Sequence, residues 1–386
     1  MTTGAPSLFQ YDPVALPAEA EALRDEVRHF LAKTLADLPP ERRAQTWDGF
    51  DVEFSRKVGA RGWIGMTWPR RYGGGERSAL ERYVMLEEML AAGAPVSAHW
   101  FADRQSGPLL LRYGSEAQRM EFLPRMARGE LSVAIGLSEP DAGSDVAALR
   151  TRGIQHGDDW IVNGAKVWTS NAHRAQFIVA LVRTRPQAEQ RHAGLSQFLI
   201  DMHSPGITVR PIIDLAGRKH FNEIAFEDVR VPGAALIGRE GEGWEQVMAE
   251  LAFERSGPER YLSSLQILIQ LVAAARESSD ASAIEAIGRA VAELATLRQL
   301  SLSIAGMLEA GRAPGLEAAL VKDLGTAFEQ SLPELLHAVL GVEPDAFGDR
   351  VQRVQATLLL LSPSFSIRGG TREILRGIIA RGLGLR

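Results

Sequence analysis

The order of three sequence patterns most constrains what this 386-residue chain can fold into. Residues 17–132 carry helical periodicity, in which apolar residues such as Leu23 and Val27 recur on one helix face. Residues 133–239 change to short apolar runs between polar turns, and residues 240–386 return to long amphipathic stretches. This order does not resemble a doubly wound nucleotide fold, and no G-x-G-x-x-G sequence follows a predicted strand.

The middle region predicts a compact antiparallel β domain. Its first strands lie in GDDWIVNGAKVWTS, where two apolar runs are joined by Asn163-Gly164, a dipeptide typical of a hairpin turn. Further short strands are predicted in FIVALVRT, LSQFLIDM, GITVRPI and EIAFEDVRVP. We therefore predict three domains: an N-terminal helical domain (1–132), the β domain (133–239) and a C-terminal helical bundle (240–386).

Composition excludes several classes of function. Apolar residues make up 45% and charged residues 24% of the chain, with a net charge of -5, and no basic stripe of the kind that binds nucleic acid is present. The chain has no cysteine, which excludes disulfides, iron–sulfur clusters, thiolate zinc sites and cysteine nucleophiles. The eight histidines form no metal-binding pattern, so no metal is expected.

The sequence also gives an expectation about location. The N-terminal segment MTTGAPSLFQYDPVALPAEAEAL lacks the basic start and apolar run of a secretory signal. The most apolar stretch, ATLLLLSPSF, is too short for a membrane span and contains a proline. We expect an intracellular, cytoplasmic protein that binds no membrane.

Three segments could carry chemistry. The first, AIGLSEPDAGSDVAALRTRG (134–153), offers amides and hydroxyls of small residues that suit a flat ring or a phosphate, although its composition alone favours a surface turn. The second, KVWTSNAHRAQFIV (166–179), places Trp168 at a strand end, where it could be core or could wall an aromatic cofactor. The third, SIRGGTREILRG (366–377), begins a helix after two glycines and leaves N-terminal amides free for an anion.

In this order and spacing, the segments resemble the acyl-CoA dehydrogenase family of flavoproteins. LSEPDAGSD is close to the family signature, and the resemblance continues through HFNEIAFEDVRVP, GREGEGWEQVMAELAFER and GGTREILRGIIARGLGL. It therefore covers nearly the whole chain. The resemblance implies a helical domain, a middle antiparallel β domain and a C-terminal four-helix bundle, with FAD between the last two.

The family's cofactor contacts carry over only where residues match. The resemblance implies that the flavin is lined by the stretch that begins at Ile135 and that Ser144 also lies near the acyl-CoA. The implied FAD contacts are Ile135, Leu137, Ser138, Gly143, Ser144, Trp168, Thr169, Ser170, Gly370, Thr371 and Glu373.

The position of the catalytic base needs a separate argument. Many members keep a glutamate just before the C-terminal Gly-Thr pair, where this chain has Gly369. Isovaleryl- and long-chain-type members instead place the base in an earlier Glu-Arg pair, which Glu254 and Arg255 match. Val247, Leu251 and Glu254 follow an i, i+4, i+7 spacing, so Glu254 is expected on an apolar stripe that raises its pKa.

The alternative for this pair is a solvated helix face. Glutamates in helices are usually exposed, and Glu254 could pair with Arg255 or Arg260. With the resemblance, we predict that Glu254 is the base and that Arg255 helps to bind CoA or to orient Glu254; Arg255 could equally be an ordinary surface charge.

The resemblance fails at two places. Homotetrameric members usually carry an Arg-x-x-Phe-Gly motif after the Glu254 helix, and its arginine contacts the FAD of a neighbouring subunit. Here LVAAARESSDASAIEAIGRAV lacks the motif, and AVLGVEPDAFGDRVQR replaces the usual glycine-rich loop. Either FAD binds differently or more weakly in this chain, or a related second chain supplies the missing contacts. We hypothesise the second, as in heteromeric bacterial members, some of which act on steroid or other bulky acyl-CoA.

Three functions remain open. The leading one is an acyl-CoA dehydrogenase that forms a 2,3-enoyl-CoA with FAD as hydride acceptor and passes electrons to an electron-transfer flavoprotein, either as a homo-oligomer or in a heteromer. The second is a dependent subunit of a heteromeric dehydrogenase. The third is flavin-dependent oxygen chemistry on the same fold, which a catalytic Glu254 disfavours. Acyl chain length, in fatty acid or steroid side-chain catabolism, cannot be derived from one sequence.

Overall fold

The computed structural model describes residues 9–186, 191–254, 257–277 and 280–385, and it describes residues 250–254 by their backbone only. The chain divides into two compact units that cut across chain order. One unit comprises Met1–Phe50, Arg77–Ser97 and Glu254–Arg386, and the other comprises Asp51–Glu76 and Ala98–Phe253. The predicted domain boundaries after residues 132 and 239 stay a prediction.

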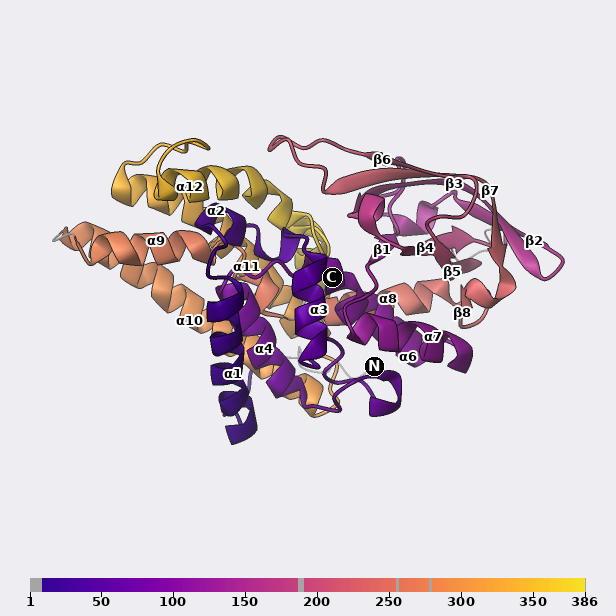
Figure 1. The fold of residues 1–386 in the computed structure, drawn as a ribbon, viewed down its shortest axis with the longest axis horizontal. Coiled ribbons are helices and arrows are strands. Elements are labelled where there is room, and N and C mark those ends of the chain that lie inside the picture. Colours follow the sequence, from indigo (N-terminus) through magenta and orange to yellow (C-terminus); the bar gives the residue numbers. More distant parts are fainter. Residues whose placement is uncertain (1–8, 187–190, 255–256, 278–279, 386) are drawn as a thin grey trace. The chain divides into compact units, whose positions relative to one another are not determined.

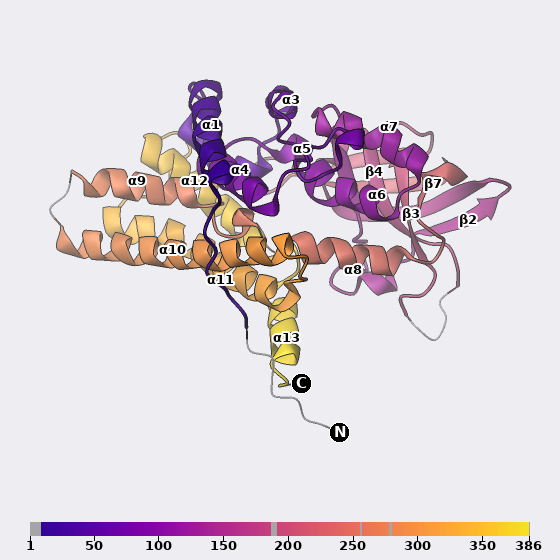
Figure 2. The ribbon, with the colours of Figure 1, turned by 90° about the horizontal axis from the view of Figure 1, so that it is seen from below.

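The first unit is helical. Its helices are α1 (Ala18–Thr34), α2 (Pro40–Arg43), α4 (Ala79–Ala91), α9 (Leu265–Ala275), α10 (Ala281–Glu309), α11 (Gly315–Leu340), α12 (Arg350–Leu361) and α13 (Arg372–Gly382). It also contains the short 3-10 turns η1 (Thr46–Asp48), η7 (Pro258–Arg260) and η8 (Ser362–Ser366). Helices α10 and α11 lie side by side (Figures 1 and 2), α9 and α12 pack against α11, and α13 packs on α11 as well. The predicted C-terminal helical bundle is therefore confirmed.

Capping and an apolar seam fix the N-terminal helices within this unit. Ser78 and Glu81 form a reciprocal capping box at the start of α4, which satisfies two backbone N–H groups that the helix leaves open. A buried cluster then joins α1, α4 and α10 through Ala20, Val84 and Leu302. Helix α4 thus packs on α1 and α10 through one continuous apolar contact.

The second unit is built on a β-sheet. In its described residues, eight strands pair in the order β6-β7-β3-β2-β4-β5-β8, and β1 pairs with β4. The strands are β1 (Val133–Gly136), β2 (Arg152–His156), β3 (Asp159–Ser170), β4 (Phe177–Arg183), β5 (Leu195–Asp201), β6 (Ile207–Pro211), β7 (Phe221–Pro232) and β8 (Leu236–Ile237). Most pairs are antiparallel, as predicted, but β1 and β2 each pair with β4 in parallel.

Helices cover one face of this sheet. The unit contains α3 (Val52–Ala60), α6 (Gly107–Tyr113), α7 (Glu116–Ala127), the 3-10 turns η2 (Arg70–Tyr72), η4 (Val146–Ala148), η5 (Ala172–Arg174) and η6 (Gly233–Ala235), and a π-helical turn, η3 (Ala102–Ser106). Leu110 of α6 and Leu123 of α7 share a core cluster with Val179 of β4. A second cluster lies among strands and joins Phe198 of β5 to Phe226 of β7. Helices α5 (Ser97–Phe101) and α8 (Gly243–Glu254) run across the boundary between the units.

The predicted hairpin turn at Asn163-Gly164 is wrong. Residues Asp159–Ser170 form one continuous strand, and the hairpin turn lies earlier, between His156 and Asp159, which pair directly. The Asn163 side chain instead accepts a hydrogen bond from the backbone N–H of Asp228 on β7 and donates one to the Asp228 carboxylate, each at 2.9 Å. Gly164 follows with φ +146°, where the pairing of β3 with β7 shifts register. The Asn163-Gly164 dipeptide therefore lies at a β-bulge within the sheet and not in a turn.

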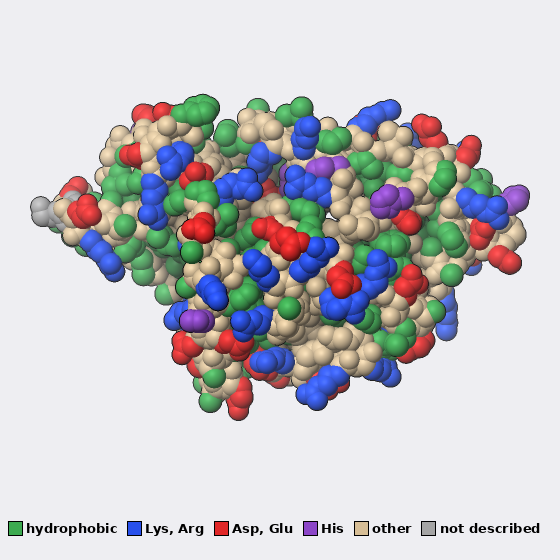
Figure 3. Space-filling view, viewed as in Figure 1, with side chains coloured by type: hydrophobic (Ala, Val, Ile, Leu, Met, Phe, Trp, Pro, Cys, Tyr) green, Lys and Arg blue, Asp and Glu red, His purple; other side chains and the backbone are tan. Residues whose placement is uncertain are grey.

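The surface charges and the helices show no large region of one charge on the face drawn and no apolar span among the described residues. On the face shown in Figure 3, Lys and Arg side chains are interspersed with Asp and Glu side chains. None of the helices in the described part of the chain combines the length and apolarity that a membrane span requires.

Candidate functional site

In the β-sheet unit, the structure brings two of the three candidate segments together. Strand β1 ends at Gly136, and Leu137 and Ser138 follow it, half-buried. The backbone N–H of Val167 on β3 donates to the carbonyl oxygen of Ser138 at 2.9 Å. The predicted cofactor residues at 135–138 and at 168–170 are therefore neighbours across one backbone hydrogen bond.

A buried ion pair lies beneath this junction. The Lys166 side chain is fully buried, and its Nζ donates to Glu139 Oε1 at 2.8 Å and to the Leu137 carbonyl oxygen at 3.2 Å. Glu139 also accepts the backbone N–H groups of Arg150 at 2.6 Å and Thr151 at 2.9 Å. The carboxylate thus takes three donors, which fixes the start of the 137–142 loop by charge-assisted hydrogen bonds.

The ionisation of this pair follows from its surroundings. Burial lowers the pKa of Lys166 to about 8, against the opposing attraction of Glu139. Burial also raises the pKa of Glu139, but the Lys166 charge and the hydrogen bonds outweigh this effect and leave the pKa of Glu139 below its usual value. Both groups are therefore charged near pH 7.

A β-bulge turns Trp168 outward. The pairing of β3 with β7 shifts register between Lys166 and Thr169, and Trp168 has φ +59° with 60% of its surface exposed. Its ring makes an edge-to-face contact with Phe221 at 6.0 Å between centroids. Because positive φ is strained for a bulky residue, this conformation marks the position as a candidate functional site.

The other predicted residues of this unit differ in exposure. Ile135 and Ser170 are half-buried, whereas Gly143 and Ser144 are exposed. Thr169 is buried, and its Oγ1 has no hydrogen-bond partner among the described residues. A buried hydroxyl without a partner costs free energy, so a ligand that accepted or donated a hydrogen bond there would relieve that cost.

The third candidate segment belongs to the helical unit. Gly369 and Gly370 have φ +66° and +99°, and Thr371 caps α13 by accepting the Ile374 N–H at 3.4 Å. Gly370 and Thr371 are half-buried and Glu373 is exposed in the first helical turn. Hydrogen bonds from its own backbone N–H and from Thr371 lower the pKa of Glu373. The predicted glycine turn followed by a helix start is present.

Helix α11 fixes this turn through three charged side chains. Lys322 Nζ donates to the Gly370 carbonyl oxygen at 2.9 Å. Asp323 accepts from Arg372 at 2.7 Å and from Arg376 at 3.4 Å, and Glu329 accepts from Arg368 at 2.6 Å. Burial raises the pKa of Asp323, but Arg372 and Arg376 outweigh it, so the net pKa lies below the usual value. We call these the α11 contacts.

The predicted base falls at the edge of the described residues. Glu254 is the last residue of α8, and its side chain and Arg255 lie outside the described residues, as does the Leu251 side chain. Val247, the first residue of the predicted apolar stripe, is buried. Pro258 is the first residue of η7. The roles of Glu254 and Arg255 stay predictions.

Sequence reasoning missed the charged residues beneath both segments. Lys166 has the same strand parity as Trp160 and Val162, so alternation along β3 places it on the inner face. Lys322 and Glu329 stand in the otherwise apolar heptad stripe of α11, which a periodicity count would have found. That stripe consists of Ala318, Lys322, Gly325, Glu329, Leu332 and Leu336.

Comparisons with known proteins identify the family. Models of the acyl-CoA dehydrogenase N-terminal, middle and C-terminal domains match residues 17–130, 134–229 and 241–384. The chain is 34% identical over 386 residues to acyl-CoA dehydrogenase IpdE1 of Mycobacterium tuberculosis, covering 95% of this chain and 98% of that protein.

Solved structures of acyl-CoA dehydrogenases have the same fold as this chain. A chain of the Tcur3481-Tcur3483 steroid ACAD superimposes with a TM-score of 0.86 at 29% identity, covering 96% of this chain and 99% of that one. A chain of the ChsE4-ChsE5 complex from Mycobacterium tuberculosis gives a TM-score of 0.83 at 29% identity, covering 97% and 99%. The predicted family and fold are confirmed: this chain belongs to the acyl-CoA dehydrogenase family of FAD-dependent oxidoreductases.

Proposed function

We propose that this chain oxidises an acyl-CoA thioester to the 2,3-enoyl-CoA, with FAD as its cofactor and Glu254 as the base that removes the α-proton. Bound FAD would supply the acceptor for the β-hydride at flavin N5. The chain's own residues would bind and orient the flavin, bind the thioester and take up the α-proton. An electron-transfer flavoprotein would then reoxidise the enzyme.

The observation that carries the flavin proposal is the junction of Ser138 with Val167. It places a large exposed aromatic ring, Trp168, beside a buried hydroxyl without a described partner, that of Thr169. An aromatic face and a hydrogen-bonding edge are what a flat polar ring requires. At Gly143 an added Cβ would meet no atom within 4 Å, so the 143–144 stretch leaves open space in which a ligand can approach the backbone.

The choice of Glu254 as base rests on two supports. The first is its match to the Glu-Arg pair of isovaleryl- and long-chain-type members, at the C-terminal end of α8. The second is that the alternative position holds Gly369, which has no side chain to accept a proton. A carboxylate beside the acyl α-carbon in a dry pocket would be a competent base.

A second candidate function is a heteromeric dehydrogenase in which a related chain completes the FAD site. Two of the similar structures are named as two-chain assemblies, Tcur3481-Tcur3483 and ChsE4-ChsE5. The missing Arg-x-x-Phe-Gly motif removes one FAD contact that homotetrameric members usually supply. The name steroid ACAD also favours bulky, steroid-type acyl-CoA as the first substrates to test.

The test is an anaerobic titration of the purified full chain with straight-chain, branched and steroid acyl-CoA. We expect a flavin spectrum that bleaches with one substrate class, and no bleaching on the timescale of the wild type in Glu254→Gln. Bleaching at the wild-type rate in Glu254→Gln would refute Glu254 as the base.

The same preparation separates the two quaternary possibilities. A colourless chain that acquires flavin only when co-expressed with a related chain would support the heteromer. Stoichiometric flavin and turnover by this chain alone would exclude the heteromeric requirement.

A further inference from the structure

Arg368 lies one residue before the Gly369–Thr371 turn and makes an unusual set of contacts. Its side chain is 12% exposed, and its Nη2 donates to Glu329 Oε2 at 2.6 Å and to Ser263 Oγ at 2.8 Å. The same nitrogen lies 3.0 Å from the Glu259 carbonyl oxygen. One guanidinium therefore contacts α11 and the 259–263 segment (Glu259 to Ser263) at once.

Glu329 joins the same two regions from the other side. It is fully buried, and while its Oε2 accepts from Arg368, its Oε1 accepts the backbone N–H of Ser263 at 2.7 Å. Ser263 Oγ also donates to the Glu259 carbonyl oxygen at 3.2 Å. The turn and the 259–263 segment thus share one carboxylate, and the segment begins five residues after Glu254.

Aromatic rings restrict how Arg368 can move. Its guanidinium carbon lies 4.6 Å from the centroid of Trp47 and 4.4 Å from that of Phe365. A planar guanidinium can stack on rings while it donates in its own plane, which a lysine ammonium cannot do. The geometry is therefore specific to arginine.

We propose that Arg368 is a positioning residue that couples the Gly369–Thr371 turn to the 259–263 segment through Glu329. Its importance for catalysis rests on the proposed function, in which the turn contacts flavin and the segment follows the helix that carries the base. Removing Arg368 then loosens both regions together and weakens flavin binding.

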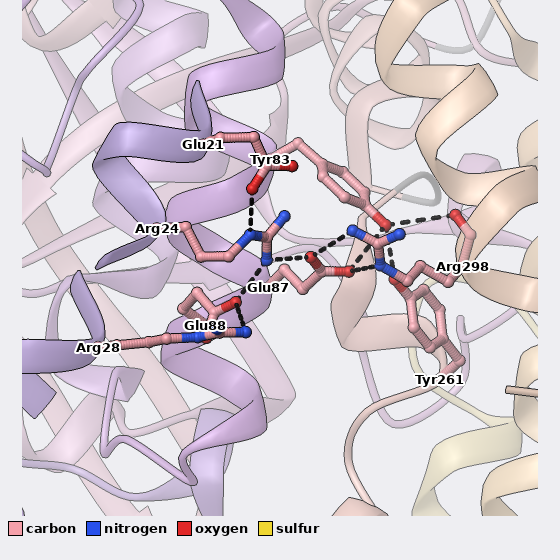
Figure 4. Close-up of polar contacts among 8 residues, drawn as sticks. All are labelled: Glu21, Arg24, Arg28, Tyr83, Glu87, Glu88, Tyr261 and Arg298. Atoms are coloured by element: carbon pink, nitrogen blue, oxygen red, sulfur yellow. Dashed lines mark hydrogen bonds and ion pairs between the residues drawn. The ribbon is translucent and has the colours of Figure 1, made fainter. Parts of the chain in front are cut away.

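A merely structural role predicts a different result, and the chain offers a matched control. Arg24 of α1 is 11% exposed and pairs with Glu87 and Glu88 of α4, within a network that also includes Arg28 and Arg298 (Figure 4). It is as buried as Arg368 and also pairs with carboxylates, yet it makes no contact with the turn. Its network reaches the 259–263 segment only at Tyr261, through Glu87 and Tyr83. Arg24→Met should therefore lower stability without loosening the turn.

The first experiment measures amide hydrogen exchange of the full chain without added ligand. In Arg368→Met we expect faster exchange in peptides covering both 366–375 and 257–265, by on the order of tenfold, and no change in 366–375 in Arg24→Met. Faster exchange in 366–375 alone in Arg368→Met, or equal loosening of both regions in Arg24→Met, would overturn the proposal.

Two further variants distinguish the positioning role of Arg368 from the destabilisation that an unpaired, buried Glu329 carboxylate would cause. Arg368→Met with Glu329→Gln leaves no uncompensated carboxylate, and we still expect both regions to exchange faster. Arg368→Lys keeps the charge but not the stacked geometry, and should restore protection only in part; full restoration would refute the arginine-specific positioning. If the Met variants do not fold, Ser263→Ala removes the two hydrogen bonds of the Ser263 hydroxyl, to Arg368 and to the Glu259 carbonyl oxygen, and leaves every charge in place. It should still loosen both regions, and loosening confined to one would count against the coupling.

The second experiment measures FAD affinity by fluorescence titration of the apoprotein, with its partner chain if one proves necessary. We expect binding about tenfold weaker in Arg368→Met and unchanged in Arg24→Met, since small displacements of positioning groups are costly. Unchanged FAD affinity in Arg368→Met would show that Arg368 does not position the residues that bind flavin. If the wild type binds no FAD in any assembly, the proposed function fails, and the exchange experiment still decides the coupling.

Discussion

The two regions predicted to contact flavin are fixed by different means. In the β-sheet unit, backbone pairs such as Val167 to Ser138 set the course of the loop, and a single buried ion pair lies beneath it. In the helical unit, the Gly369–Thr371 turn depends on the α11 contacts, three charged side chains on one helix. A sheet supplies its own register, whereas a helix start has no ladder to position it, so side chains must do so.

The largest expected loss of stability follows from breaking the buried Lys166–Glu139 pair. Lys166→Met leaves the Glu139 carboxylate buried without its cation, and we expect it to lower the free energy of unfolding by about 3–5 kcal/mol, measured by urea denaturation. Arg230→Met is the control. Arg230 of β7 pairs with Asp159, which lies on β3 as Lys166 does, but the Arg230 side chain is 73% exposed. Its loss should therefore lower the free energy of unfolding by about 0.5 kcal/mol or less. Equal losses in the two variants would mean that the sheet alone fixes the loop.

The second prediction uses pH to test the buried ion pair of the β-sheet unit. The pKa of Lys166 is about 8 in the folded chain and near 10.5 in the unfolded chain, so between these values the unfolded chain binds more protons. The contribution of Lys166 to stability therefore rises with pH from about 8 to 10.5, by up to about 1 kcal/mol per unit.

The measurement is urea unfolding at several pH values between 7.5 and 10.5. Other groups titrate there as well, so the quantity to compare is the difference between wild type and Lys166→Met with Glu139→Gln. A difference that does not change with pH would show that Lys166 keeps its proton throughout the range.

The sequence predicts the helix–strand–helix order well, because periodicity is a local property. It fails where a residue's partner is distant in sequence. Asn163 reads as a turn residue, yet its partner is Asp228, 65 positions later. For Lys166, strand alternation indicates an inward position but not its partner, Glu139, which lies 27 positions earlier.

The same limit applies to the candidate site. Cofactor residues 135–144 and 168–170 could be proposed from the sequence because a motif carries them. No motif carries Lys322 and Glu329, and a lysine and a glutamate in a helix are usually exposed. Only their place in the apolar stripe of α11 indicates burial, and only the structure gives their partners, Gly370 and Arg368.

The third prediction concerns the outermost of the α11 contacts. Asp323→Asn removes the charge that pairs with Arg372 and Arg376, whose side chains are 28% and 62% exposed. We expect a loss of about 1–2 kcal/mol by urea denaturation, smaller than at Lys166, since solvent screens these arginines and Lys322 and Glu329 remain. Glu285→Gln on α10, which breaks an exposed pair with Arg289, is the control and should change little. A loss as large as that of Lys166→Met would mean that the turn, too, depends on one pair.

The smallest expected effect tests the turn's backbone. Gly369 has φ +66°, so Gly369→Ala should destabilise the chain by about 1 kcal/mol, because the left-handed region is unfavourable for a residue with a Cβ. Gly377 lies within α13, where an added Cβ meets no atom within 4 Å, so Gly377→Ala should stabilise by about 0.5–1 kcal/mol. Thermal or urea unfolding of both variants would show the opposite signs. A stabilising Gly369→Ala would mean that the turn can leave the left-handed region while the α11 contacts persist, and that these contacts, rather than the backbone conformation, determine where the start of α13 lies.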